Sequence, residues 1–99
     1  MTVYRDIYDG IASSTPAQGA MVRLLKLQEE AGEVAQAFIG YTGANARKGV
    51  THTETDVAKE LCDVVITAMV AMHDFVPDPE AFLAEQLVVL KDRIKREGS

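Results

Sequence analysis

Cysteine is almost missing from this sequence, which has one, Cys62, among its 99 residues. A lone thiol can form no disulfide within the chain and no cysteine cluster for zinc, so we expect a reducing, cytoplasmic setting. The amino-terminal stretch MTVYRDIYDG has no signal-peptide pattern. Long apolar runs are also lacking. The longest, VVITAMVAM, is far short of the ~20 residues that cross a bilayer, so we expect no membrane span.

Basic residues are outnumbered, 10 against 15 acidic ones, which gives a formal net charge of −5. Duplex nucleic acid is bound mainly by lysine and arginine, so we expect no duplex partner. A small phosphorylated ligand is not excluded, because a metal ion can lie between acidic side chains and phosphates. Tryptophan is absent, yet 47% of the residues are hydrophobic, which excludes disorder by composition. The length fits a single domain, residues 1–99.

Helical periodicity without strand-like alternation predicts an all-α fold, a four-helix bundle-like single domain. Two helix starts are well marked: Thr15-Pro16-Ala17-Gln18 is a capping box, and Asp78-Pro79-Glu80 is an N-cap followed by a first-turn proline. A long loop from Gly40 to Thr53 exceeds the ~2–8 residues that usually join packed helices, which favours a functional loop. The expected helices are about 3–12, 15–40, 53–73 and from 78 to near the carboxyl terminus.

Acidic residues are crowded at two places. In the second helix, LQEEAGEVAQAF holds Glu29, Glu30 and Glu33 beside Gly32, a residue that weakens a helix by ~1 kcal/mol relative to alanine. In the third helix, a narrow polar stripe contains the pair Glu60 and Asp63 with Asp56 and Thr67. The rest of that helix is apolar around most of its circumference, so we expect it to be largely buried.

The two acidic pairs share one spacing, because Glu30 and Glu33 are three residues apart, as are Glu60 and Asp63. Residues at i and i+3 lie on one helix face, so antiparallel packing would bring four carboxylates together. Two such charges 4 Å apart repel by ~4 kcal/mol at an effective dielectric near 20, and a divalent cation reverses that sign. Oxygen-only ligation favours Mg²⁺, with Mn²⁺ possible, over zinc. The alternative is a solvated acidic helix face.

Both motifs, with their helical context over residues 20–75, resemble the EExxE…ExxD signature of the MazG-like all-α nucleoside triphosphate pyrophosphohydrolases. The resemblance implies Mg²⁺-dependent cleavage of the α–β phosphoanhydride of (d)NTPs to the monophosphate and pyrophosphate. It also implies a homodimer or homotetramer in which helices of two chains complete a four-helix core. By position, Glu30, Glu33, Glu60 and Asp63 would be the metal ligands. Glu29 would be catalytic, contacting a second metal or taking a proton from the attacking water.

Basic residues near the acidic motifs are candidates for contacts with phosphate oxygens. We expect Arg47 and Lys48 of the long loop to serve in this way, with His52 and Lys59 as further candidates. Three alternatives remain open at this point. The substrate could be phosphoribosyl-ATP, or dUTP or dCTP specifically, or the chain could be a non-catalytic helical dimerisation module.

Overall fold

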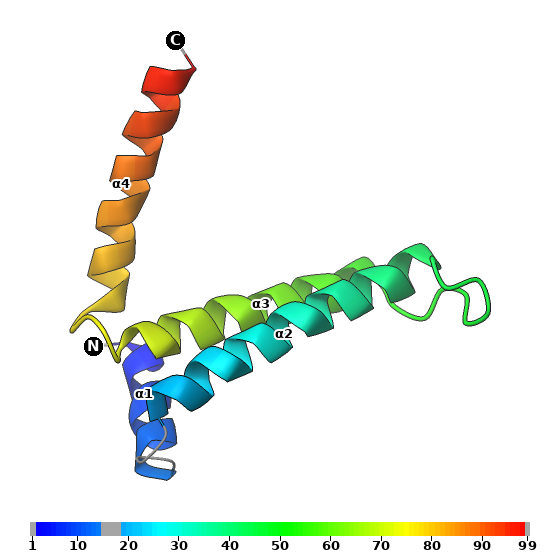
Figure 1. Cartoon of the computed structure of the whole chain (residues 1–99), viewed down its shortest axis with the longest axis horizontal. Coiled ribbons are helices and arrows are strands. Elements are labelled where there is room, and N and C mark those ends of the chain that lie inside the picture. Colours follow the sequence, from blue (N-terminus) through cyan, green and yellow to red (C-terminus); the bar gives the residue numbers. More distant parts are fainter. Residues whose placement is uncertain (1, 15–18, 99) are drawn as a thin grey trace.

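The computed structural model describes residues 2–14 and 19–98. These residues form four helices and no strand, which confirms the predicted all-helical single small domain. Helices α2 and α3 run antiparallel as a long hairpin, α1 crosses one end of it, and α4 projects away from that same end (Figure 1). The helices are α1 (Val3–Ser14), α2 (Gly19–Thr42), α3 (Glu54–Met72) and α4 (Pro79–Glu97).

The starts of α3 and α4 agree with the sequence signals. Asp78 caps α4 by accepting a hydrogen bond from the Ala81 amide at 3.2 Å. Thr53 caps α3, and its side chain and the Asp56 carboxylate form a reciprocal capping box. The hydrogen bonds from Thr53 lower the pKa of Asp56, so this acid of the polar stripe serves the helix end. The capping box predicted at 15–18 lies outside the described residues, and α2 continues two residues beyond Gly40.

The hairpin has a thin core of small and polar residues. The buried residues of α2 include Ala37 and Gly40 but no large apolar side chain. The prediction that α3 is largely buried is wrong for the single chain, because Leu61 and Val65 are 50% and 54% exposed and Cys62 is exposed as well. The physical reason is that α2 covers only one side of α3, and α1 covers only its carboxyl-terminal part, where Met69–Ala71 are buried.

One side of the hairpin is apolar and uncovered. Successive residues of an α-helix are about 100° apart around its axis, which places the apolar stripes of α2 and α3 on the same side of the hairpin. Glu33 and Asp63 lie on the other side, where α1 also lies. No other part of the described chain covers this apolar side, and its side chains are exposed. We call it the hairpin apolar face, and its members are Leu24, Ala31, Ala35, Phe38, Leu61 and Val65.

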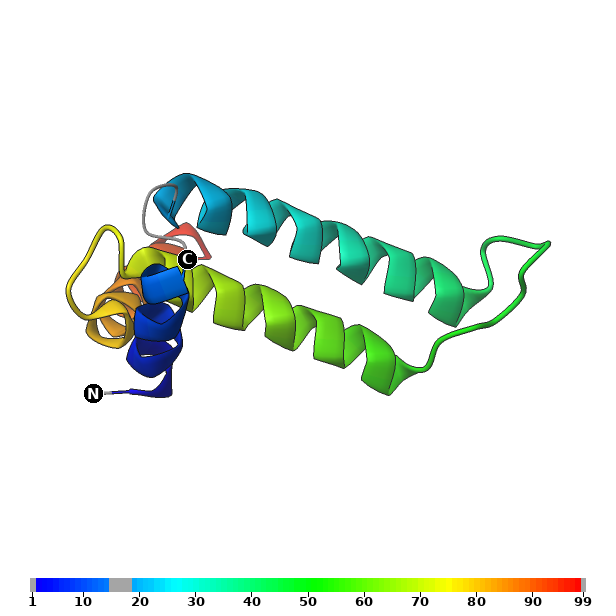
Figure 2. The same ribbon diagram turned by 90° about the horizontal axis from the view of Figure 1, so that it is seen from below.

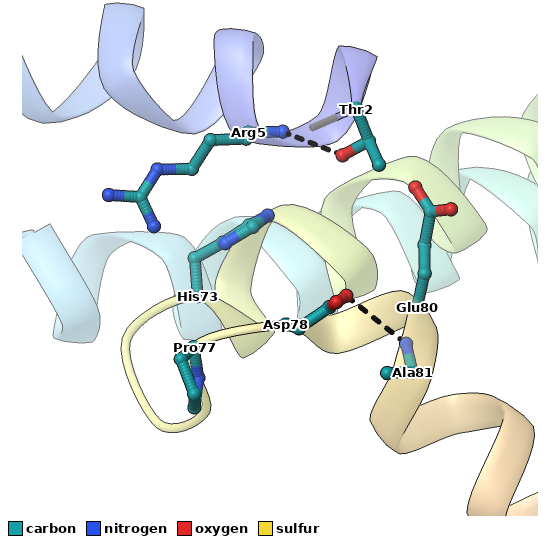
Figure 3. A pocket seen from close by; sticks show the side chains of 7 residues that line it. All are labelled: Thr2, Arg5, His73, Pro77, Asp78, Glu80 and Ala81. Atoms are coloured by element: carbon teal, nitrogen blue, oxygen red, sulfur yellow. Dashed lines mark hydrogen bonds between the residues drawn. The ribbon is translucent and has the colours of Figure 1, made fainter.

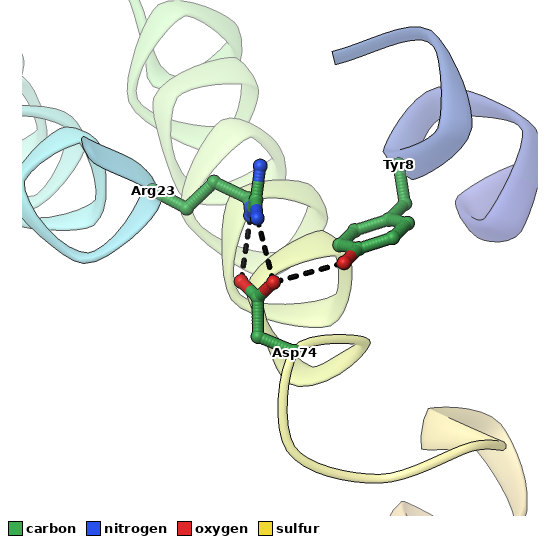
Figure 4. Close-up of polar contacts among 3 residues, drawn as sticks. All are labelled: Tyr8, Arg23 and Asp74. Atoms are coloured by element: carbon green, nitrogen blue, oxygen red, sulfur yellow. Dashed lines mark hydrogen bonds and ion pairs between the residues drawn. The ribbon is translucent and has the colours of Figure 1, made fainter. Parts of the chain in front are cut away.

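A buried ion pair joins α1 to the hairpin, and nothing in the sequence pattern indicated it. Arg23 of α2 donates two hydrogen bonds of 2.6 Å to the Asp74 carboxylate, just after α3 (Figure 4). Tyr8 of α1 donates to the same carboxylate at 2.9 Å, and the Arg23 guanidinium lies 4.8 Å from the centre of its ring. The hydrogen bonds from Arg23 lower the pKa of Asp74. Arg23 is only 6% exposed, so the cluster stabilises the junction.

The loop after α2 returns across Gly40, which leads to a testable contrast between two glycines. Thr51 and His52 both donate backbone hydrogen bonds to the Gly40 carbonyl, and a Cβ at Gly40 would collide with the His52 imidazole. A Cβ at Gly32 meets open space. We expect Gly40→Ala to destabilise the protein by about 1–3 kcal/mol and Gly32→Ala to stabilise it by up to about 1 kcal/mol. Urea unfolding measures both changes, and a stabilised Gly40→Ala variant would contradict this packing.

None of the helices formed by residues 2–14 and 19–98 has the length and apolar character that crossing a membrane requires.

Candidate metal centre

Three carboxylates from the two hairpin helices converge on one point. Glu30 of α2 and Glu60 and Asp63 of α3 each offer an oxygen, and these oxygens lie within 4.8 Å of one another. Opposite ligands of Mg²⁺ are about 4.2 Å apart, since each lies ~2.1 Å from the ion. Small side-chain rotations therefore suffice for all three to reach one cation. The antiparallel pairing inferred from the i,i+3 spacing brings these residues together.

The three carboxylates differ in burial, because Glu30 is buried, Glu60 is partly buried and Asp63 is exposed. Glu30 is 7% exposed, and its Oε2 is buried without a hydrogen-bond partner. Oε2 of Glu60 is buried and unpartnered as well. A carboxylate oxygen without a partner is expensive to bury, and coordination to a cation is one of the few ways to offset that penalty. The donor set of Glu30, Glu60 and Asp63 thus fits a hard divalent cation bound by oxygen.

Glu33 lies at the edge of the same group. The charge of Glu30 raises the pKa of Glu33, and the nearby charge of Glu60 adds to the effect. A carboxyl group with a raised pKa holds its proton more tightly in the folded state. The repulsion between Glu33 and the neighbouring carboxylates therefore has its full strength above the pKa of Glu33. It weakens as the pH falls through that pKa. A fourth acidic side chain next to the three convergent ones increases the demand for a counter-charge.

Lys26 supplies part of that counter-charge, and the sequence reasoning missed it. Its ammonium lies 3.2 Å from Glu30 and 3.6 Å from Glu29, and the hydrogen bond to Glu30 raises the pKa of Lys26. The i,i+4 spacing of Lys26 and Glu30 was the available signal. Glu29 itself has a largely exposed side chain at the rim. One lysine beside Glu29, Glu30 and Glu33 leaves the group strongly negative.

The predicted phosphate contacts lie in two places, because Arg47, Lys48 and His52 are in the loop after α2 and Lys59 directly precedes Glu60 on α3. Arg47 and Lys48 lie in the loop beyond Thr42, and Glu33 precedes the end of α2 by about 14 Å at the rise of an α-helix. Lys48 and His52 line a small cavity of about 110 Å³ next to Gly40. Lys59 is exposed on α3. The roles of these four residues stay predictions.

An apolar cavity of about 180 Å³ lies beside the carboxylates, on the side covered by α1. Lys26, one turn before Glu30, and Thr67, one turn after Asp63, line it together with the buried Arg23. The Nη1 atom of Arg23 is buried and has no hydrogen-bond partner. The remaining walls are aliphatic side chains from three helices: Ile7, Ile11, Val22, Ile66 and Val70. Apolar walls with a few convergent polar groups are typical of small-molecule sites.

A larger cavity of about 400 Å³ lies at the junction of α1 and α4, away from the carboxylates (Figure 3). Two of its polar side chains cap helices, because Thr2 accepts from the Arg5 amide and Asp78 accepts from the Ala81 amide. Arg5 also pairs with Asp9 at 3.2 Å. These contacts engage three of its polar side chains. Glu80 and His73 also line the cavity, and both ring nitrogens of His73 are buried without a hydrogen-bond partner. We assign no chemistry to this cavity.

No protein-family model, curated protein or solved structure matches the chain.

Proposed function

We propose that the protein is a cytoplasmic, Mg²⁺-dependent nucleoside triphosphate pyrophosphohydrolase, as the resemblance to the MazG-like enzymes implies. The observation that carries the proposal is the convergence of carboxylates from two helices around buried, unpartnered oxygens of Glu30 and Glu60. Glu30, Glu60 and Asp63 would hold the cation, with Glu33 joining them. When bound, Mg²⁺ would screen the triphosphate charge and lower the pKa of a coordinated water.

The side chains around the carboxylates would contact the other parts of a nucleotide, which are its phosphate oxygens and its nucleoside. Lys26 would exchange its contacts with Glu29 and Glu30 for a phosphate oxygen once a cation neutralises those acids. Glu29, released from Lys26, would be placed at the rim to accept a proton from the attacking water. The apolar cavity beside Lys26 would hold the nucleoside. Positioning and charge neutralisation are the main contributions that phosphoryl transfer needs from a protein.

Self-association forms part of the same proposal. The hairpin apolar face leaves α2 and α3 half covered, and a second hairpin stacked on it would complete a four-helix core. This supports a homodimer, or a homotetramer built from two such dimers. The acidic side of the hairpin stays open to substrate in that arrangement, because it faces away from the hairpin apolar face.

The test is a pyrophosphate-release assay with each common ribo- and deoxyribonucleoside triphosphate in Mg²⁺. We expect pyrophosphate and monophosphate in equal amounts, and no release in excess EDTA. Phosphoribosyl-ATP, dUTP and dCTP are included because the base and sugar preference is open. If no triphosphate yields pyrophosphate with Mg²⁺ or Mn²⁺, the enzyme proposal fails and the chain is better described as a helical association module.

Lys26→Met provides a first test of the phosphate contact. We expect KM to rise about tenfold with a smaller change in kcat, because a charge-assisted hydrogen bond to substrate is lost. The Lys95→Met variant, on the exposed α4 away from the carboxylates, is the matched control. Steady-state kinetics separate KM from kcat. An unchanged KM in Lys26→Met would remove this residue from the binding site and would return attention to Arg47 and Lys48.

A further inference from the structure

We propose that α4 is a self-association helix that pairs antiparallel with α4 of a second copy of the chain. The contact surface is the α4 seam, defined as Leu83, Leu87, Leu90 and Ile94. This pairing is independent of the metal centre and distinct from the hairpin apolar face, since it involves a different helix and different residues.

The α4 seam has the spacing of a coiled coil. Its residues follow one another at intervals of four, three and four, which matches alternating d and a positions of a heptad. At about 100° per residue they fall within a stripe less than ~80° wide. Their side chains are 39–58% exposed. A narrow apolar stripe of this kind is the pattern by which one helix packs along another.

No part of residues 2–14 and 19–98 covers the seam. Pro79 is the only buried residue of α4, and every residue from Glu80 to Gly98 is exposed. Helix α4 rises from the end of the hairpin at a steep angle in Figure 1 and is seen nearly end-on in Figure 2, where the hairpin lies across the view. The short turn between α3 and α4 is held by the Phe75 and Val76 amides, which donate to the Met72 carbonyl. The seam therefore has no cover from its own hairpin.

The accessible surface of the chain is larger than that of a compact protein of the same mass. Its accessible surface is 7169 Å², whereas a compact protein of this mass exposes about 5,500 Å². The excess of roughly 1,600 Å² is about twice the ~800 Å² that each partner buries in a standard interface. The radius of gyration is 17.0 Å, against ~13 Å for a compact domain of this length. The excess area is enough for two contact surfaces, the hairpin apolar face and the α4 seam.

The net charges of the two ends of α4 and the helix dipoles favour antiparallel pairing. The first half of α4, residues 79–90, contains Glu80 and Glu85 and no basic residue. The second half, residues 91–97, contains four basic residues against two acidic ones. An antiparallel pair places each acidic half against a basic half and also opposes the helix dipoles, while a parallel pair places like charges together.

Distances between identical spin labels test the antiparallel pairing in the full chain. With Cys62→Ser as background, single cysteines replace Ala81, Val88 or Lys95, which lie one heptad apart on the same flank of α4. An antiparallel pair centred between residues 88 and 89 gives the shortest label-to-label distance at 88. The distances at 81 and 95 should both be longer by about 10 Å, since the axial offset grows by ~3 Å per residue from the centre. Equal distances at all three positions, a steady change along the helix, or no dipolar coupling would each overturn the proposal.

A second measurement needs no labels. Leu87→Glu/Leu90→Glu places charges in the seam, and because both side chains are exposed the fold should stay intact by circular dichroism. We expect the mass from light scattering to fall at least twofold. Val88→Glu, equally exposed but off the seam, should leave the mass unchanged. An unchanged mass in the double variant contradicts the α4 pairing, whether or not the protein hydrolyses nucleotides.

Discussion

Glu30→Gln is expected to lower kcat/KM for nucleoside triphosphates by at least about 10³-fold, which corresponds to roughly 4 kcal/mol of lost transition-state stabilisation. Glutamine keeps the volume of Glu30 but removes the charge that would bind the cation, at the most buried of the convergent carboxylates. Asp63→Asn, on α3, should lower kcat/KM to a similar extent. The pyrophosphate-release assay in Mg²⁺ measures both effects.

Two controls separate chemistry from folding. Glu85→Gln removes a carboxylate from the exposed α4 and should leave kcat/KM unchanged. The helical circular dichroism of Glu30→Gln should match that of the wild type, because glutamine fills the same space between α2 and α3. If Glu30→Gln retains activity within a few fold, or if it unfolds the chain, the carboxylates do not hold a catalytic metal.

The largest expected effect on stability comes from Asp74→Ala. Loss of the Asp74 carboxylate leaves the Arg23 guanidinium buried and unpaired. It also removes the acceptor of the hydrogen bond from the Tyr8 hydroxyl. Breaking a buried ion pair at one partner costs about 3–5 kcal/mol, a large part of the stability of a domain this small. Urea unfolding followed by circular dichroism measures the change. Asp9→Ala, which breaks the exposed Arg5–Asp9 pair, should cost less than about 1 kcal/mol.

The same ion pair predicts the acid limit of stability. The pKa of Asp74 is lowered by its hydrogen bonds to Arg23. A carboxyl group with a lowered pKa contributes its full stabilisation above the unfolded-state pKa of about 4, and the contribution is lost as the pH falls through the folded-state value. Asp74→Asn should therefore remove part of the stability loss seen below about pH 4. An acid unfolding curve parallel to that of the wild type would contradict this role for Asp74.

Local spacing in the sequence predicted most of the candidate site. Glu30 and Glu33 on one helix, with Glu60 and Asp63 on the next, are related by the helical repeat, so antiparallel packing alone brings them close. The ion pair of Arg23 and Asp74 could not be predicted in this way, because 51 residues separate its partners. No periodicity links two such positions. Their meeting depends on the length of the hairpin and on where the turn after α3 places Asp74.

The burial of α3 shows a different limit of sequence reasoning. Its apolar circumference predicted that the helix is largely buried, yet Leu61 and Val65 are exposed in the single chain. Periodicity reports how many sides of a helix are apolar and says nothing about which chain covers each side. The same applies to α4, whose heptad spacing is clear and whose seam has no partner within the described residues.

Thermal unfolding of the wild type and of Glu60→Gln, each with EDTA and with MgCl₂, tests most directly whether the convergent carboxylates form a cation site. In EDTA, Glu60→Gln should melt at or above the wild-type temperature, because one of several mutually repelling charges is gone. MgCl₂ at a hundred times the Kd should stabilise the wild type by about 2.7 kcal/mol, and Glu60→Gln by much less. NaCl at matched ionic strength corrects for screening. Equal Mg²⁺ shifts in both proteins, or a lower melting temperature of Glu60→Gln in EDTA, would contradict the account.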